Sequence, residues 1–163
     1  KEFSRILPSL EYCTFSISAI PIPWETPPSV CTQETKRAVA ELAVAYTEKQ
    51  TAVISGMAKG VDSYAHTACL KAKGYTVAVL ANGLDICYPS EHEKLKECIE
   101  NKGLVISEYP PGIRPTKYTF PKRNRLISAW SDELIVVAAG KKSGALITAD
   151  YSKKYGRKII FCG

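Results

Sequence analysis

The stretch that decides the fold runs from Thr51 to Ala81 and reads TAVISGMAKGVDSYAHTACLKAKGYTVAVLA. Two apolar, β-branched runs, Thr51–Ser55 and Thr76–Ala81, flank a helical pattern over Asp62–Lys73. Strands that are apolar along their whole length and are joined by helices are typical of a parallel sheet that is covered on both faces. The stretch therefore predicts a strand–helix–strand unit.

The same alternation continues on both sides of this unit. Further strands are predicted at Thr14–Ser18, Leu104–Ser107, Glu133–Ala138 and Lys158–Cys162. Helical patterns cover Glu34–Lys49, Ser90 to about Gly103, Pro121–Trp130 and Ser143–Tyr155. The predicted fold is a doubly wound, Rossmann-like α/β domain. It has a mostly parallel sheet of about six strands, helices on both faces, and a proline-rich, irregular first part over residues 1–30.

Composition sets limits on this domain. The 163 residues suffice for one domain with a full hydrophobic core, and no apolar run approaches the roughly 18 residues that a membrane helix needs. The six cysteines are scattered without a Cys-x-x-Cys pair, so we expect buried free thiols in a reducing cytosol, with no metal and no cofactor. Because the chain starts at Lys1 without a Met, we expect a domain excised from a longer protein.

The segment from Tyr109 to Trp130 is strongly basic. The whole chain has 22 Lys plus Arg against 16 Asp plus Glu, a net charge of +6, and this segment has no acidic residue. Its cations, interleaved with the rings of Tyr118 and Phe120, are Arg114, Lys117, Lys122, Arg123 and Arg125. Cations that neutralise phosphates beside rings that stack on bases are the components of a single-strand nucleic-acid site. The alternative interpretation is a solvated basic helix, or Arg side chains bonded to nearby carbonyls.

Ligands of open α/β sheets bind at the carboxyl ends of the strands, and each unusual motif here follows a predicted strand. These motifs are Ser55–Asp62, Asn82–Asp85, the basic segment and Gly140–Ala145. Their glycines let the backbone approach a ligand, and helix N-termini present N–H groups to anions. We therefore expect one shared rim of cations, made of Lys59, Arg114, Lys117, Lys122, Arg123, Arg125, Lys141 and Lys142.

Four polar residues near this rim allow an enzyme as an alternative: Asp62, His66, Asp85 and Glu108. They could supply general acids and bases beside a nucleotide. The interpretation that we favour is structural. Asp62 caps its helix with His66 one turn later, while Asp85 and Glu108 tie down loops or pair with arginines.

Several of these blocks resemble the DNA-processing protein A (DprA/Smf) family. The similar blocks are Ser55–Asp62 with Ala65-His66, Gly83-Leu84-Asp85, Ser107–Gly112, Phe120–Ile127 and Ser143–Ala149. The resemblance runs from about Val53 to the C-terminus, and the Phe-Pro-x-Arg-Asn-Arg order at Phe120–Arg125 is its most diagnostic part. It implies a cytoplasmic, dimeric, non-enzymatic protein that binds single-stranded DNA and hands it to a RecA-type recombinase during natural transformation.

The resemblance also implies site residues. The family's strand-binding pocket uses a Gly after the third strand, here Gly83, and a Lys and a Phe three residues apart, here Lys117 and Phe120. With the motifs above, the predicted DNA-binding set is Gly56, Lys59, Gly83, Lys117, Phe120, Lys122, Arg123, Arg125, Ser143 and Gly144.

The chain departs from the family at one place. Members usually carry a Gly-Ser-Arg turn after the first strand, whereas Ser16–Trp24 holds no Gly or Arg, so one pocket wall is missing or rebuilt. Two other readings therefore stay open: a Rossmann-like enzyme that binds or hydrolyses nucleotides, and a divergent paralogue that binds DNA weakly.

Overall fold

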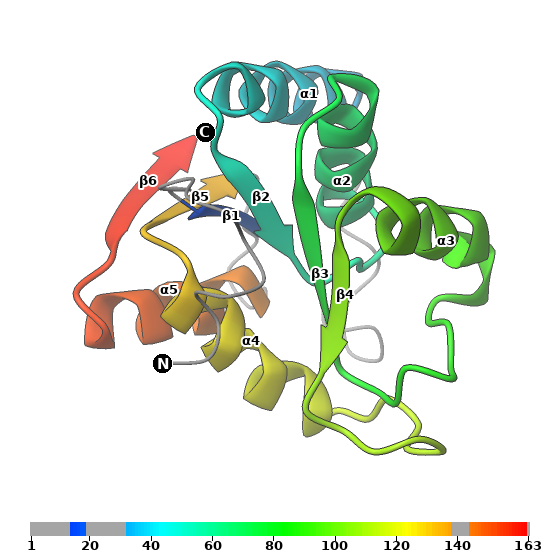
Figure 1. Cartoon of the computed structure of the whole chain (residues 1–163). Coiled ribbons are helices and arrows are strands. Elements are labelled where there is room, and N and C mark those ends of the chain that lie inside the picture. The colour runs from blue at the N-terminus through cyan, green and yellow to red at the C-terminus, as the bar shows by residue number, and fades with distance from the viewer. Residues whose placement is uncertain (1–13, 19–31, 138–143, 163) are drawn as a thin grey trace.

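The computed structural model describes residues 14–18, 32–137 and 144–162 and confirms the α/β, Rossmann-like class. Its sheet has the strand order β4-β3-β2-β1-β5-β6, and every neighbouring pair is parallel (Figure 1). The strands are β1 (Thr14–Ser18), β2 (Ala52–Ser55), β3 (Thr76–Leu80), β4 (Leu104–Ser107), β5 (Glu133–Val137) and β6 (Lys158–Cys162).

Helices cover both faces of the sheet. On one face α1 packs against α2 and α2 against α3, while α4 and α5 pack together on the other face (Figure 1). The helices are α1 (Gln33–Glu48), α2 (Val61–Lys71), α3 (Glu93–Lys102), α4 (Thr119–Trp130) and α5 (Gly144–Lys154). A short 3₁₀ turn, Ser90–His92, precedes α3.

The two layers exist because neighbouring strand residues point to opposite faces. In β2, Val53 joins the core under α1 and α2, whereas the next residue, Ile54, packs with Ile127 of α4 on the other face. The side chains of Ile127 and Val53 are fully buried. Burial of a side chain of this size stabilises the fold by about 1.5–3 kcal/mol relative to an exposed position. This double cover explains why the strands are apolar along their whole length.

The strand order reverses at β1, where β2 lies on one side and β5 on the other. The registers Ser55↔Ala78 and Leu80↔Ser107 bring the carboxyl ends of β2, β3 and β4 to one edge of the sheet. The loops that follow these three strands therefore meet, as the sequence predicted. The loops after β1 and β5, including Ser143, Lys141, Lys142 and most of the Ser16–Trp24 stretch, lie outside the described residues.

The predicted start of α4 at Pro121 was wrong by two residues. Thr119 already donates its backbone N–H to the carbonyl of Thr116, at 3.1 Å, and Lys122 donates to Tyr118, at 3.4 Å. The chain thus coils before the proline is reached, and Pro121 occupies the third helical position. Proline is tolerated there because the first-turn N–H groups have no partner inside the helix.

Within the described residues, none of the helices is both long and apolar enough to cross a membrane.

Candidate nucleic-acid interface

The turn after β3 is bonded to the basic segment. Gly83 donates its N–H to the carbonyl of Ile113 at 2.9 Å, and both carboxylate oxygens of Asp85 accept from the N–H of Gly112, at 3.0 and 2.9 Å. A Cβ on Gly83 would lie 2.6 Å from the carbonyl oxygen of Pro110, so only glycine fits here. The predicted loop-holding role of Asp85 is confirmed. The backbone of Gly83 closely approaches the chain's own basic segment, whereas the sequence predicted a close approach to a ligand.

The start of α4 presents two exposed lysines beside aromatic rings. The Nζ of Lys117 lies 5.2 Å from the ring centroid of Tyr118, which is 74% exposed, and the Nζ of Lys122 lies 5.9 Å from that of Tyr109. In the described part of the chain, Lys117, Lys122 and the exposed Arg114 have no ion-pair partner. These three cations are therefore available to an anion.

Phe120, two residues after the exposed Tyr118, is half-buried. Its ring packs against Tyr88 at a centroid distance of 5.9 Å and an angle of 55°. Tyr88 is 39% exposed, so the two rings form a small aromatic shelf at the carboxyl edge of β3 and β4. Tyr88 was absent from the predicted site because it precedes Phe120 by one strand and one helix, and no local pattern joins them.

The remaining predicted cations have partners within the chain. Lys59 is exposed and forms an ion pair with Glu91 at 2.8 Å, and Arg125 pairs with Glu108. The second pair confirms the predicted pairing of Glu108 with an arginine. Exposed pairs of this kind contribute little to stability, so Lys59 remains able to exchange its partner for a phosphate.

Arg123 differs from all the other cations because its side chain is buried, with 1% exposure. Its Nη1 donates to the carbonyls of Gly56, at 2.8 Å, and Val79, and its Nε donates to the side-chain oxygen of Asn124, at 2.9 Å. Burial lowers the pKa of Arg123 to about 10, while the nearby charge of Asp62 opposes this shift, so the guanidinium is still charged at neutral pH. The interpretation of arginines bonded to carbonyls is thus confirmed for this residue.

Asp62 and His66 lie in the same buried region, both with no exposed surface. One carboxylate oxygen of Asp62 accepts the N–H groups of Gly56, at 3.1 Å, and Ala58, at 3.3 Å. Asp62 therefore holds the glycine turn before its helix, and the predicted helix-capping role was wrong because Gly60 occupies the N-cap. Burial raises the pKa of Asp62 against the opposing charge of Arg123, and it lowers the pKa of His66 to about 3.

This burial bears on the enzyme alternative. Asp62 and His66 lack access to a substrate in this conformation. Asp85 is bonded to the loop at Gly112, and Glu108 is paired with Arg125 of α4. The described residues also contain no group of three His, Cys, Asp or Glu side chains placed to hold a metal ion.

The last two residues of the predicted DNA-binding set adjoin α5. Gly144 forms the first residue of α5, and its predicted neighbour Ser143 is not described.

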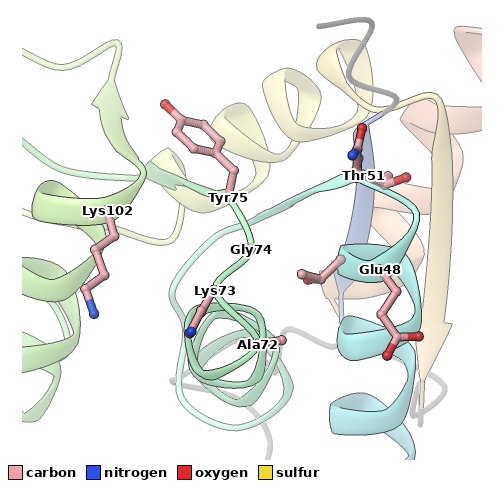
Figure 2. Close-up of a pocket in the computed structure, with 9 residues that line it drawn as sticks. Glu48, Thr51, Ala72, Lys73, Gly74, Tyr75 and Lys102 are labelled. Atoms are coloured by element: carbon pink, nitrogen blue, oxygen red, sulfur yellow. The ribbon is translucent and has the colours of Figure 1, made fainter.

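A separate cavity of about 440 Å³ lies at the opposite edge of the sheet, where β2 and β3 begin (Figure 2). Residues at the carboxyl ends of α1, α2 and α3 line it, among them Glu48, Ala72 and Lys102. Carboxyl ends of helices carry partial negative charge, which disfavours phosphates. The cavity, whose lining also includes Lys73, thus lies apart from the candidate surface at the carboxyl edge of β3 and β4.

Comparison with known proteins identifies the family. The family described as DNA recombination-mediator protein A matches residues 30–162. The Smf protein of Synechocystis is 45% identical over 108 residues, which are 66% of this chain and 27% of that protein. The DNA processing protein DprA of Streptococcus pneumoniae is 42% identical over 113 residues, covering 69% of this chain and 40% of that protein. The chain thus spans well under half the length of these relatives.

Two solved structures of the family share the fold. DprA from Streptococcus pneumoniae aligns with a TM-score of 0.80 at 31% identity, over 92% of this chain and 50% of that one. DprA from Helicobacter pylori, solved to show its single-stranded DNA binding mode, aligns with a TM-score of 0.78 at 29% identity, over 91% of this chain and 64% of that one. A molybdenum cofactor binding protein from Rippkaea orientalis shares the fold alone, with a TM-score of 0.62 at 14% identity. The chain therefore belongs to the DNA recombination-mediator protein A family.

Proposed function

We propose that this domain binds single-stranded DNA at the carboxyl edge of β3 and β4. The observation that carries the proposal is a group of exposed cations beside the exposed ring of Tyr118, namely Arg114, Lys117 and Lys122, which form no ion pair with any residue that the structure describes. Lysines neutralise phosphates of any sequence, and rings stack on any base. Such a surface suits a flexible single strand, whose bases are free to stack.

The proposed role of the predicted residues follows from their exposure. Lys117 and Lys122 contact phosphates, and the shelf formed by Tyr88 and Phe120 receives a base. Lys59 joins them by releasing Glu91. We propose that Gly56, Gly83 and Arg125 shape the surface without carrying its main contacts, and that Gly144 and Ser143 extend it along the same edge of the sheet.

We propose a binding role rather than a catalytic one, since the four candidate acid–base residues serve the fold. We also propose that a cytoplasmic homodimer transfers the bound strand to a RecA-type recombinase during natural transformation. The family's description as a recombination mediator supports the transfer step. No observation within the described chain favours a nucleotide-hydrolysing enzyme over this binder. Detection of base release from a nucleoside monophosphate that disappears in Glu108→Gln would reverse this choice.

The test is a titration of fluorescent oligo-dT at several salt concentrations, with duplex DNA as competitor. We expect tighter binding to the single strand, and an affinity that falls with salt because the release of counterions gains less entropy when the salt concentration is higher. Lys117→Ala should make the salt dependence shallower by between about 0.7 and about 1 unit in log–log slope. The matched control is Lys71→Ala, an exposed lysine at the far end of α2, which should bind like the parent.

Two outcomes would contradict the proposal. Equal affinity for duplex and single strand at moderate salt would remove the preference for single strands. Identical salt slopes for Lys117→Ala and the parent would show that this edge is not the DNA site.

A further inference from the structure

Arg123 is the largest fully buried side chain in the described part of the chain, although it stands in the middle of the basic segment. A buried guanidinium cannot reach a phosphate without leaving its partners. Those partners belong to two other elements: the turn after β2, through the carbonyl of Gly56, and β3, through the carbonyl of Val79. The residue therefore joins α4 to the two strands that lie beneath the proposed DNA surface.

Gly56 forms the seat for this guanidinium. A Cβ at Gly56 would lie 2.5 Å from Cζ, Nη1 and Nη2 of Arg123, closer than any real contact. The backbone conformation at position 56 does not require a glycine, because its φ lies outside the left-handed range. Gly60, with a φ of +98°, differs in this respect. The glycine at this position thus makes room for Arg123, although in the sequence it looks like a phosphate-binding turn.

The guanidinium also lies under the aromatic shelf. Its Cζ is 5.7 Å from the ring centroid of Phe120, which is one helical turn earlier on α4. Phe120 in turn packs against Tyr88. Asp62, which bonds the N–H groups of the glycine turn, supplies the nearby negative charge that offsets the buried cation. One side chain is therefore in contact with the turn, the strand and the ring.

We propose that Arg123 is a positioning residue for DNA binding: seated on Gly56, it fixes Phe120 for stacking and touches no DNA itself. This inference rests on the proposed function of the same surface. It gives Arg123 a different role from Lys117, although both are cations of the same segment. Loss of Arg123 acts through the ring, whereas loss of Lys117 removes a phosphate contact.

The first test compares Arg123→Lys, Phe120→Ala and the double variant in oligo-dT titrations, after melting curves show that each is folded at the assay temperature. Arg123→Lys keeps the charge but loses the planar group that bonds two carbonyls. We expect an affinity loss no larger than that of Phe120→Ala, roughly 5- to 150-fold if the ring stacks on one base. The double variant should bind like Phe120→Ala alone, and the salt slope of Arg123→Lys should equal that of the parent.

The second test perturbs the seat without changing a charge. Gly56→Ala should lower both the melting temperature and the oligo-dT affinity in the parent, and should have a much smaller effect in the Arg123→Lys background, where no guanidinium meets the new Cβ. Equal effects of Gly56→Ala in both backgrounds would show that Arg123 is not what this glycine accommodates. This comparison also tests the positioning role of Arg123 if the double variant of Arg123→Lys with Phe120→Ala is too unstable to titrate.

The outcomes separate the two proposals. A parent that does not bind oligo-dT contradicts the proposed function itself. A parent that binds, with Arg123→Lys binding equally well or losing affinity additively with Phe120→Ala, overturns only the positioning role. A shallower salt slope in Arg123→Lys, like that of Lys117→Ala, would assign Arg123 to a phosphate contact instead.

Discussion

The buried histidine of α2 should make the stability of this domain depend on pH. His66 has no exposed surface, and its Nδ1 lies 2.6 Å from the hydroxyl oxygen of Thr76. That hydroxyl donates to the carbonyl of Val53 at 2.9 Å, so it accepts a hydrogen bond from the N–H at Nδ1, and the lone pair of the neutral ring is on Nε2. Burial, followed by the charges of His92 and Arg123, lowers the pKa of His66 to about 3.

The sign of the effect follows from the order of the two pKa values. In the unfolded chain His66 titrates near its usual pKa of about 6.5. Below that pH the unfolded state binds a proton that the native state does not bind. The contribution of His66 to the free energy of unfolding is therefore fully present above pH 6.5 and falls as the pH decreases toward 3. The loss is about 1.4 kcal/mol per pH unit well below pH 6.5, which amounts to between about 2 and about 3 kcal/mol from pH 7.5 to 4.5. Asp62 acts in the opposite direction, because burial raises its pKa and the native state takes up its proton first as the pH falls.

His66→Asn isolates the histidine from all other groups. Asparagine keeps an N–H donor for Thr76 but does not titrate, and Asp62 is the same in both proteins. Urea unfolding followed by circular dichroism at pH 7.5 and 4.5 should show the parent losing between about 2 and about 3 kcal/mol more than the variant between these pH values. Stability curves that run parallel in the two proteins would refute the burial argument.

Three further predictions concern the proposed DNA surface. Tyr118→Ala should lower oligo-dT affinity by about 1–3 kcal/mol if its exposed ring stacks on a base, whereas Tyr118→Phe should bind like the parent; equal losses in both would point to the hydroxyl instead. Asp85→Ala should lower the melting temperature and the affinity together by releasing the N–H of Gly112, and an affinity loss without any thermal effect would contradict this loop-holding role. In salt titrations Lys122→Ala should make the slope shallower by between about 0.7 and about 1 unit, and Arg125→Ala, whose partner is Glu108, by clearly less; the reverse order would show that the ion pair opens on binding.

Much of the fold could be predicted from the sequence because its signals are local. The apolar runs and the helical stripes each depend on neighbouring residues. Five of the six predicted strands begin at their observed first residue, and the sixth begins one residue before it. The apolar runs of β2 and β5 predicted double cover, and the structure shows it in the opposite orientations of Val53 and Ile54. The start of α4 was missed because the turn at Thr116 is stabilised by its own hydroxyl, which composition does not reveal.

The site could be predicted only as a region. A lysine, an exposed arginine and a buried arginine look the same in a basic segment, and Arg123 differs from them only through the carbonyls of Gly56 and Val79, which are 67 and 44 positions away. The Tyr88–Phe120 contact is likewise a product of the tertiary fold. Local sequence therefore predicts how much positive charge the segment carries, while packing determines which charges face solvent.

This division of the cations matters more for function than their number. The basic segment holds most of the excess charge of the chain. However, Arg123 is buried inside the fold, and Arg125 forms an ion pair with a carboxylate. Lys117 and Lys122 remain, each beside a tyrosine ring, at the start of a helix where cations are locally unfavourable. The fold thus places unpaired positive charge where the helix does not stabilise it. A bound phosphate would offset that cost, because it would contact both the lysines and the positive end of the helix. For this reason the described geometry favours an anionic, ring-bearing ligand over a structural role for these lysines.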